Sequence, residues 1–202
     1  MIGMIDYGSG NLRSVYNAFR YLGAELKICR TPEEVRSVEK LVLPGVGSGK
    51  DSMNCLDDRD LIAPIKEHIA GGKLFLGICL GLQLLFTKSE ESGGCDCLDV
   101  IKGDVKLFPR AEGLKVPQIG WNTVAMKRPE CPLFMGIPDN TFFYFVHSYY
   151  CVPGDNDNVA GITGYGLDYV SVLWKDNVFA TQFHPERSQK YGLKMLENFI
   201  RL

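Results

Sequence analysis

The chain contains 202 residues, of which 46% are hydrophobic and 23% charged, a length and a composition that suit one compact globular domain. Its formal net charge of −2 argues against a basic surface for nucleic acid or for an anionic membrane, and no apolar run approaches the roughly 20 residues that span a bilayer. The N-terminus lacks a basic region, and seven scattered cysteines show no disulfide framework, which together favour a cytoplasmic protein with reduced thiols.

The first half of the chain alternates short apolar runs with amphipathic segments. The apolar runs predict strands at residues 2–5, 26–29, 40–43 and 74–78. Apolar residues spaced by three and four predict helices over 12–22 and 61–69. We expect Asn11 and Gly23 to cap the two ends of the first helix. The unbroken run at 74–78 is typical of a strand that is covered on both faces.

The second half of the chain is rich in predicted strands. These are expected at residues 105–108, 141–146, 169–173 and 178–183. Ser188 is expected to cap a final helix, and residues 88–103 are expected to form the most mobile loop. No repeat or linker divides the chain, so residues 1–202 are read as a single domain. The order of elements predicts an α/β fold with a mostly parallel central sheet, helices on both faces and extra strands in the second half.

Cys79 lies in the strongest local motif, Gly77-Ile78-Cys79-Leu80-Gly81. This is the thiol form of the nucleophile elbow, in which a strand ends, turns sharply and starts a helix at the reactive residue. A helix N-terminus favours the thiolate, and the N–H of Leu80 is placed to donate to an oxyanion. A buried core cysteine is the alternative interpretation, and it is the one we adopt for the other six cysteines.

Three histidines are candidates for the base that such a nucleophile requires. His68 falls in the predicted 61–69 helix and is expected to be exposed to solvent, and His147 follows an apolar strand and could line a cleft. His184 ends a strand and is followed by Pro185 and Glu186. Because the carboxyl ends of parallel strands share one edge of a sheet, His184 can meet Cys79 there, with Glu186 orienting its ring. A structural histidine at a strand end is the alternative.

Two cofactor sites are disfavoured by incomplete motifs. The His184-x-Glu186 pair occurs in zinc deaminases, but their P-C-x-x-C segment is absent and the chain has only Cys95-Asp96-Cys97. The Gly8-Ser9-Gly10 turn resembles the start of a dinucleotide fingerprint, but Arg13 replaces its third glycine. We therefore expect neither a metal nor another cofactor.

The segment Pro44-Gly45-Val46-Gly47 follows the predicted 40–43 strand and belongs at the same edge of the sheet. Glycines on both sides of Val46 would let its peptide turn its N–H toward an anion. Two glycines in a loop are also compatible with a plain turn.

Together these motifs resemble the class I, or triad, glutamine amidotransferases. The resemblance rests on 77–83 and on Gln182-Phe183-His184-Pro185-Glu186. Within this family, the chain most resembles the glutaminase subunits of imidazole glycerol phosphate synthase. Four further segments carry this closer resemblance: residues 6–12, Pro44–Gly47, 119–122 and 143–149. The similarity covers essentially the whole chain, with its motifs in the expected order.

The resemblance implies a mechanism and a set of site residues. Cys79 would attack the side-chain amide of L-glutamine, His184 would carry the proton, and Glu186 would orient His184. Val46 and Leu80 would supply the oxyanion N–H groups. The positions that match the glutamine-binding residues of the family are Gly47, Gln83, Glu91, Ser148 and Tyr149.

The resemblance also implies a partner. Ammonia would pass to a (β/α)₈-barrel cyclase subunit in a heterodimer, giving imidazole glycerol phosphate and an aminoimidazole carboxamide ribonucleotide in histidine biosynthesis. The positions that match the interface with this partner are Trp121, Asn122, Tyr144 and Arg187.

Some positions depart from the family pattern. Gln118 stands where relatives commonly have histidine. Ser48-Gly49 follows Pro44–Gly47, the oxyanion segment, where a bulkier residue is usual. The Cys95–Cys97 stretch is poorer in glycine than the same stretch of the family. A stand-alone thiol hydrolase, a noncatalytic binding protein and a glutaminase that feeds a sugar-modifying synthetase remain the alternatives.

Overall fold

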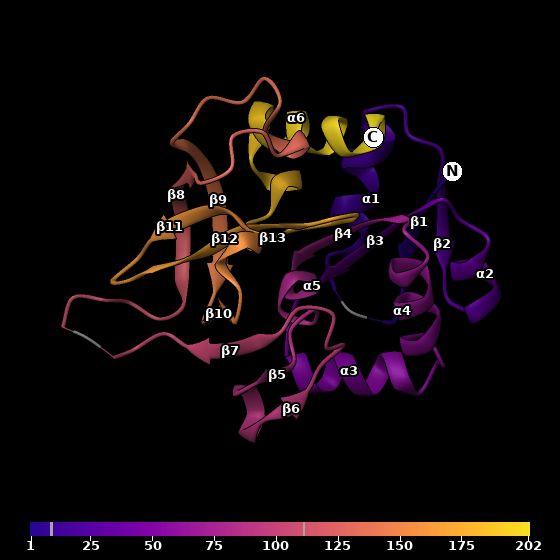
Figure 1. The fold of residues 1–202 in the computed structure, drawn as a ribbon, viewed down its shortest axis with the longest axis horizontal. Coiled ribbons are helices and arrows are strands. Elements are labelled where there is room, and N and C mark those ends of the chain that lie inside the picture. The colour runs from indigo at the N-terminus through magenta and orange to yellow at the C-terminus, as the bar shows by residue number, and fades with distance from the viewer. Residues whose placement is uncertain (9, 111) are drawn as a thin grey trace.

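The computed structural model describes residues 1–8, 10–110 and 112–202; Ser9, in the glycine-rich turn considered above, lies outside them. The first half of the chain forms strand–helix units, as expected from its alternating pattern (Figure 1). The strands of this half are β1 (Ile2–Ile5), β2 (Leu26–Cys29), β3 (Lys40–Gly45) and β4 (Leu74–Cys79). Its helices are α1 (Leu12–Tyr21), α2 (Pro32–Arg36), α3 (Gly49–Asp57), α4 (Ile62–Ala70) and α5 (Leu80–Gln83).

The second half of the chain forms mainly antiparallel strands before a last helix. The short strands β5 (Lys88–Ser89) and β6 (Cys95–Asp96) come first. The longer strands are β7 (Gly103–Leu107), β8 (Gln118–Met126), β9 (Thr141–His147), β10 (Tyr149–Pro153), β11 (Val159–Gly164), β12 (Asp168–Lys175) and β13 (Val178–Thr181). The chain ends in α6 (Gln189–Arg201).

The strand order explains how the two ends of the chain meet. Along the central path the order is β2-β1-β3-β4-β13-β12-β10-β7-β5-β6. The first four strands run parallel, and β13 joins them parallel to β4 with Val178 opposite Phe75. From β13 to β12 the pairing becomes antiparallel. The last strand of the chain therefore lies beside the strand that ends at Cys79.

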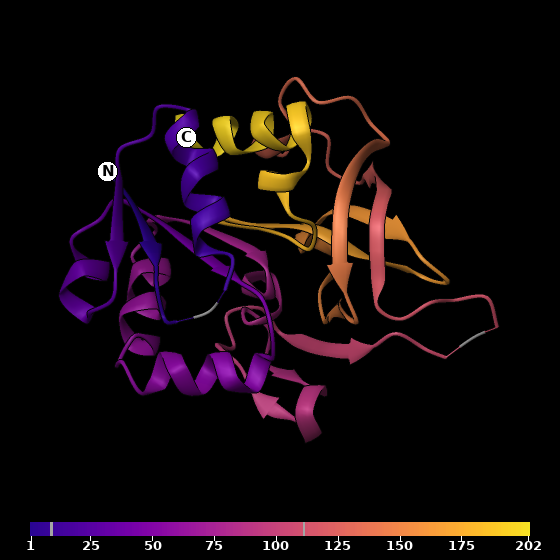
Figure 2. The ribbon, with the colours of Figure 1, turned by 180° about the vertical axis from the view of Figure 1, so that it is seen from behind.

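Helices cover both faces of the parallel part of the sheet, as predicted. Figures 1 and 2 show α1 and α6 on one face and α3 and α4 on the other. Alternate residues of β4 enter the two hydrophobic clusters: Phe75 packs on the side of α3 and α4, and Leu76 on the side of α1 and α6. This double coverage is why the β4 sequence is apolar without a break.

The outer antiparallel part carries a β8–β9 hairpin, which joins the rest of the sheet where β8 pairs with β11. Strands β8 and β9 pair with each other over seven registered positions, from Gln118 opposite His147 to Val124 opposite Thr141. Figure 2 shows this pair standing apart from the parallel layer.

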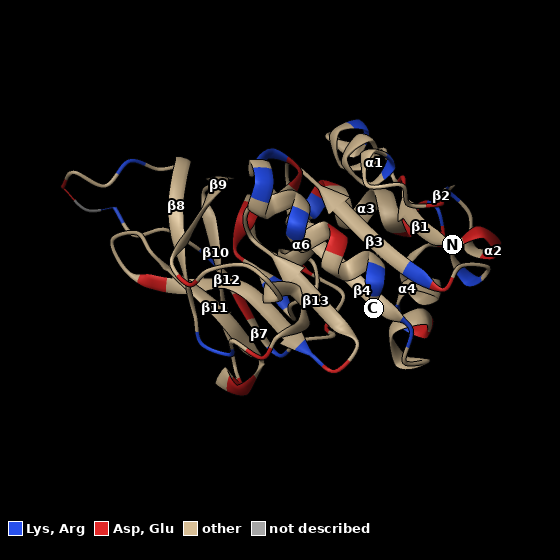
Figure 3. Cartoon of the chain, turned by 90° about the horizontal axis from the view of Figure 1, so that it is seen from above, with Lys and Arg blue, Asp and Glu red and all other residues tan. Residues whose placement is uncertain are grey.

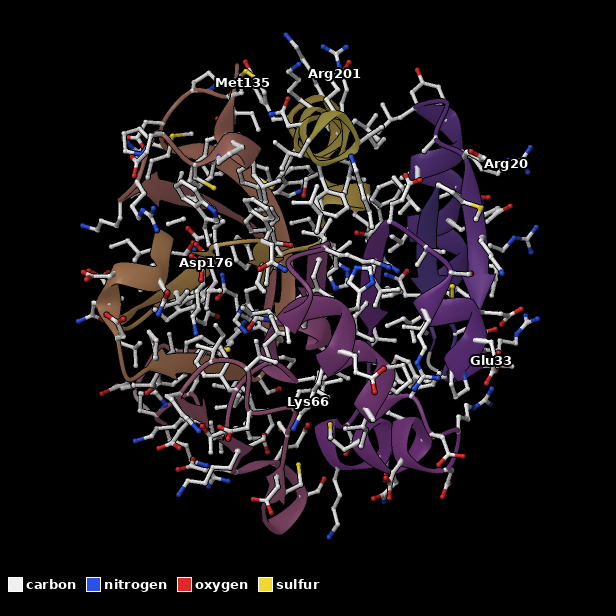
Figure 4. The ribbon with its side chains drawn as sticks, turned by 45° about the vertical axis from the view of Figure 1, so that its right-hand side comes forward. Arg20, Glu33, Lys66, Met135, Asp176 and Arg201 are labelled. Carbon is white, nitrogen blue, oxygen red and sulfur yellow. The ribbon has the colours of Figure 1, made fainter. Side chains whose placement is uncertain are left out.

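Charged side chains such as Arg20, Glu33 and Arg201 project outward from the body in Figure 4, and their burial would cost free energy.

Several local expectations are corrected. His68 is buried, not exposed, because α4 turns it toward β4, where its Nε2 lies 3.1 Å from the carbonyl oxygen of Leu74. Ser188 precedes α6 but makes no side-chain cap. The segment predicted as a long loop, 88–103, contains β5 and β6, and β5 pairs with β7. Gly23 does follow the end of α1, at a φ of +79°.

Candidate active site

Cys79 occupies a strained corner between β4 and α5. Its φ is +55°, a region that side-chain-bearing residues seldom adopt. The neighbouring glycines are required by close backbone contacts: a Cβ on Gly81 would lie 2.0 Å from the carbonyl oxygen of Leu43, and one on Gly77 would lie 2.6 Å from that of Gly81. The predicted elbow is therefore formed, and its glycines let strand and helix cross without a clash.

The parallel pairing of β13 with β4 brings the predicted base to this corner. Thr181 lies opposite Ile78, one residue before Cys79, and the chain continues from Thr181 to His184. Gln182, on the way, points its Nε2 at the Cys79 sulfur over 3.8 Å. This contact gives the sulfur a hydrogen-bond donor.

His184 is held by Glu186 in a dry environment. Nδ1 of His184 lies 2.8 Å from Oε1 of Glu186, and their side chains are 1% and 0% exposed. Nε2 has no hydrogen-bond partner in the part of the chain that the structure describes. Burial lowers the pKa of His184, but the Cys79 thiolate and Glu186 raise it more, to about 10. The His184 ring is thus kept protonated, with Glu186 holding its Nδ1.

Asn11 occupies the N-cap position of α1, as expected, but its side chain belongs to this cluster. Its φ is +71°, and its side chain makes no cap hydrogen bond to α1. Its Nδ2 instead donates to Oε1 of Glu186 over 2.8 Å, because a buried carboxylate is the stronger acceptor. Its Oδ1 accepts from Arg187 over 3.1 Å. The sequence offered no signal for this contact, since 175 residues separate Asn11 from Glu186.

Ser188 fixes the backbone of the base instead of capping α6. Its hydroxyl donates to the carbonyl of His184 over 2.7 Å and accepts from the N–H of Tyr144 over 3.0 Å. The carbonyl of Tyr144 in turn accepts from the N–H of His184 over 2.9 Å. Strand β9 therefore holds His184 through main-chain contacts.

A cavity of about 290 Å³ opens next to the sulfur. Its lining includes every residue predicted to form the oxyanion site or to bind glutamine. These are Val46, Gly47, Leu80, Gln83, Glu91, Ser148 and Tyr149, joined by Cys79 itself. Pro117, Val146 and His147 complete the wall, and of these only His147 had been considered.

Two of the cavity residues are engaged with their neighbours. Oε2 of Glu91 accepts from the N–H of Gly49 over 2.5 Å, at the start of α3 and just after the oxyanion segment. Nε2 of Gln83 donates to the carbonyl of Tyr149 over 3.0 Å and to Oε1 of Gln182 over 3.1 Å. The Gln83 side chain therefore links two lining residues of the cavity, and Glu91 links the cavity lining to the start of α3.

The residues predicted to bind a partner lie outside the cavity. Trp121 and Tyr144 face each other across β8 and β9, with ring centroids 6.1 Å apart. Asn122 donates to the carbonyl of Gly164, so it ties the hairpin to the end of β11. Arg187 is half exposed, and through Asn11 it links the surface to Glu186.

Comparison with known proteins agrees with this geometry. The sequence profile of the family Glutamine amidotransferase class-I matches residues 3–202. A relative from Dehalococcoides mccartyi (strain ATCC BAA-2266 / KCTC 15142 / 195), named imidazole glycerol phosphate synthase subunit HisH, is 47% identical over 100% of this chain and 97% of its own. A relative of the same name from Syntrophotalea carbinolica is 48% identical over 98% of each chain.

Solved structures share the fold at low sequence identity. The structure of PurLQS from Thermotoga maritima superposes with a TM-score of 0.78 at 19% identity, over 99% of this chain and 97% of that one. A crystal structure of a glutamine amidotransferase gives a TM-score of 0.77 at 17% identity, over 100% and 99% of the two chains.

Proposed function

The chain belongs to the class I glutamine amidotransferase family, and on that premise we propose that it is the glutaminase subunit of an imidazole glycerol phosphate synthase. It hydrolyses glutamine to glutamate and ammonia, and it passes the ammonia to a cyclase partner in histidine biosynthesis. The observation that carries the proposal is the meeting of Cys79 with the buried His184–Glu186 pair at one edge of the sheet, in a chain similar to HisH subunits over its whole length.

In the proposed reaction the thiolate of Cys79 attacks the amide carbon of the glutamine side chain. A C–S bond forms, and the carbonyl electrons move onto oxygen. His184 gives the proton on Nε2 to the amide nitrogen, the C–N bond breaks, and ammonia leaves a thioester behind. Water then gives one proton to His184 while its oxygen attacks the thioester carbon, and the C–S bond breaks. This restores the thiolate beside a protonated His184 and releases glutamate, whose new carboxyl group gives its remaining proton to solvent.

Glu186 and Asn11 are proposed to orient the base. Glu186 accepts from Nδ1 of His184, which leaves Nε2 turned away from the carboxylate and available for proton transfer. Asn11 donates to the same carboxylate oxygen and so limits its rotation. The charge that develops on the substrate oxygen would be met by the N–H groups of Val46 and Leu80, both on the cavity wall.

The β8–β9 hairpin is the surface we propose for a (β/α)₈-barrel cyclase. Its two strands carry no charged residue, so they are entirely tan in Figure 3. Ile119, Trp121 and Phe142 are 63%, 46% and 59% exposed there. Large exposed apolar side chains of this kind mark protein interfaces, in which aromatic residues supply much of the binding free energy.

A cytoplasmic location is part of the proposal. All seven cysteines are free, as expected where thiols stay reduced. Within residues 1–8, 10–110 and 112–202, no helix has the length and apolar character needed to cross a membrane.

Glutamate release by the purified chain, with and without the cyclase, tests the proposal. The Pro44–Gly47 segment must present an N–H to the substrate, and one such donor contributes about 2.7–4 kcal/mol to the barrier. We therefore expect docking, with the cyclase ligand bound, to raise the rate by about 100-fold or more. Full activity of the single chain would favour a stand-alone thiol hydrolase.

A further inference from the structure

His147 lines the cavity beside Cys79 but is outside the triad. Its ring is buried at the end of β9, with Nδ1 2.8 Å from the carbonyl oxygen of Tyr149. Nε2 lies 3.2 Å from the hydroxyl of Tyr169. A carbonyl can only accept a hydrogen bond, so Nδ1 carries the proton of the neutral ring and Nε2 is an acceptor.

The surroundings keep this ring uncharged. Burial lowers the pKa of His147 to about 4, and the hydrogen bond to Tyr149 only partly opposes this. The nearby His184, when protonated, lowers it further. At neutral pH His147 therefore binds a second proton poorly, and it does not compete with His184 for the proton of the reaction.

The ring is also fixed in place. Phe108 and Phe145 pack against it with centroids 5.3 and 5.8 Å away. The hydroxyl of Tyr169 lies 2.9 Å from Oε1 of Gln118, which pairs with His147 across β8 and β9. The Tyr169 hydroxyl therefore lies between the His147 ring and the Gln118 amide and contacts both.

What His147 holds is the wall of the cavity. The carbonyl of Tyr149 accepts from both Nδ1 of His147 and Nε2 of Gln83. The carbonyl of Ser148 accepts from the N–H of Phe108 over 3.1 Å. The corner at Ser148 and Tyr149, which lines the cavity, is thus held by hydrogen bonds at both of its carbonyls.

We infer that His147 is a positioning residue, whose Nδ1–H holds the Tyr149 carbonyl and so sets the corner against which glutamine binds. It donates one fixed hydrogen bond and takes no part in proton transfer. The inference rests on the proposed function, because it requires glutamine to occupy this cavity.

Two substitutions of His147 distinguish the effect of its hydrogen bond to Tyr149 from the effect of the imidazole ring itself. Asparagine can place its Nδ2 close to the position of Nδ1, so His147→Asn keeps the donor to Tyr149, whereas His147→Leu fills space without it. In the complex with the cyclase, we expect His147→Leu to raise KM for glutamine about tenfold, which corresponds to the net loss of one buried hydrogen bond. We expect kcat and its pH profile to stay close to wild type, and His147→Asn to recover most of the increase in KM.

Three outcomes would overturn the inference. One is a fall in kcat at unchanged KM, or a shifted pH profile, which would make His147 a proton carrier. Another is that His147→Asn has the same raised KM as His147→Leu while both variants stay folded and bind the cyclase.

If His147→Leu does not fold, the Tyr169→Phe variant replaces it. We expect this variant to raise KM for glutamine several-fold, and an unchanged KM would contradict the inference. A wild-type complex unable to hydrolyse glutamine would instead remove the proposed function, and this inference with it.

Discussion

At the scale of single residues, Cys79 differs from the other cysteines in its backbone and in its neighbours. Burial raises the pKa of Cys29 and Cys131 to about 11 and that of Cys97 to about 12, so these thiols stay protonated at neutral pH. Cys79, unlike these three cysteines, stands at an elbow with φ +55° and faces His184. The choice of Cys79 over the remaining thiols, made from the glycine pattern, agrees with these surroundings.

The titration of His184 should depend on the thiolate. Burial alone would lower its pKa, so the value of about 10 requires the negative charges of Cys79 and Glu186. We predict that Cys79→Ser, which has no thiolate, makes His184 lose its proton at a clearly lower pH. Nitrogen chemical shifts of the ring would follow this in both proteins. His147 provides the internal reference, because its ring stays neutral down to about pH 4. If His184 titrates identically in Cys79→Ser and in the wild type, the sulfur does not interact with the His184 ring.

At the scale of elements, the elbow depends on two strands and a helix crossing at their backbones. Gly81 has no room for a Cβ because the carbonyl oxygen of Leu43 would lie 2.0 Å away. We predict that Gly81→Ala lowers the free energy of unfolding by about 3 kcal/mol, the upper end of the overpacking range. Urea unfolding would measure it.

The matched control is Gly154→Ala, in the turn after β10. The nearest atom to its Cβ would be 3.4 Å away, which is an ordinary contact. The change there should stay within about 0.5 kcal/mol, as for most surface substitutions. Equal losses at the two glycines would show that the close approach at the elbow is relieved at little cost.

Elements with a strong apolar pattern could be predicted from the sequence, and polar or short ones could not. Strand β4 is apolar throughout because both its faces are covered, and α1 has a clear buried stripe. Helix α3 is mostly polar and was missed, although Ser48 caps it. Helix α2 has only five residues, and its signal was the capping box at Thr31 and Glu34.

The site residues differ in the same way: some could be predicted from the pattern of strands, and others could not. Cys79 and His184 could be placed together because parallel strands end at one edge of the sheet, a rule that needs only the direction of the strands. The contacts of Asn11 with Glu186 and of Glu91 with Gly49 depend on side chains that meet across long separations in the chain. The burial of His68 was not predicted, because it depends on how α4 lies against β4, where the ring meets the carbonyl of Leu74.

At the scale of the whole molecule, the account requires a partner on the β8–β9 hairpin. We predict that Trp121→Ala weakens binding to the cyclase by about 30-fold or more, since a central aromatic side chain commonly contributes 2 kcal/mol or more. Isothermal titration calorimetry would measure the affinity. Tyr21→Ala is the matched control, because Tyr21 is an 80% exposed aromatic side chain at the end of α1, an element outside the hairpin. Comparable losses for the two variants would contradict this interface.

If the chain only supplies ammonia, its nucleophile is dispensable when ammonia comes from solution. Cys79→Ala removes the nucleophile but leaves the hairpin with Trp121 unchanged, so the complex should still assemble. Formation of the cyclised product would be measured on one preparation of that complex, first with glutamine and then with ammonium salt at high pH, where more free ammonia is present. We predict that synthesis from glutamine is lost and synthesis from ammonia is retained. Loss of both in an assembled complex, or retention of the glutamine-driven reaction, would contradict the account.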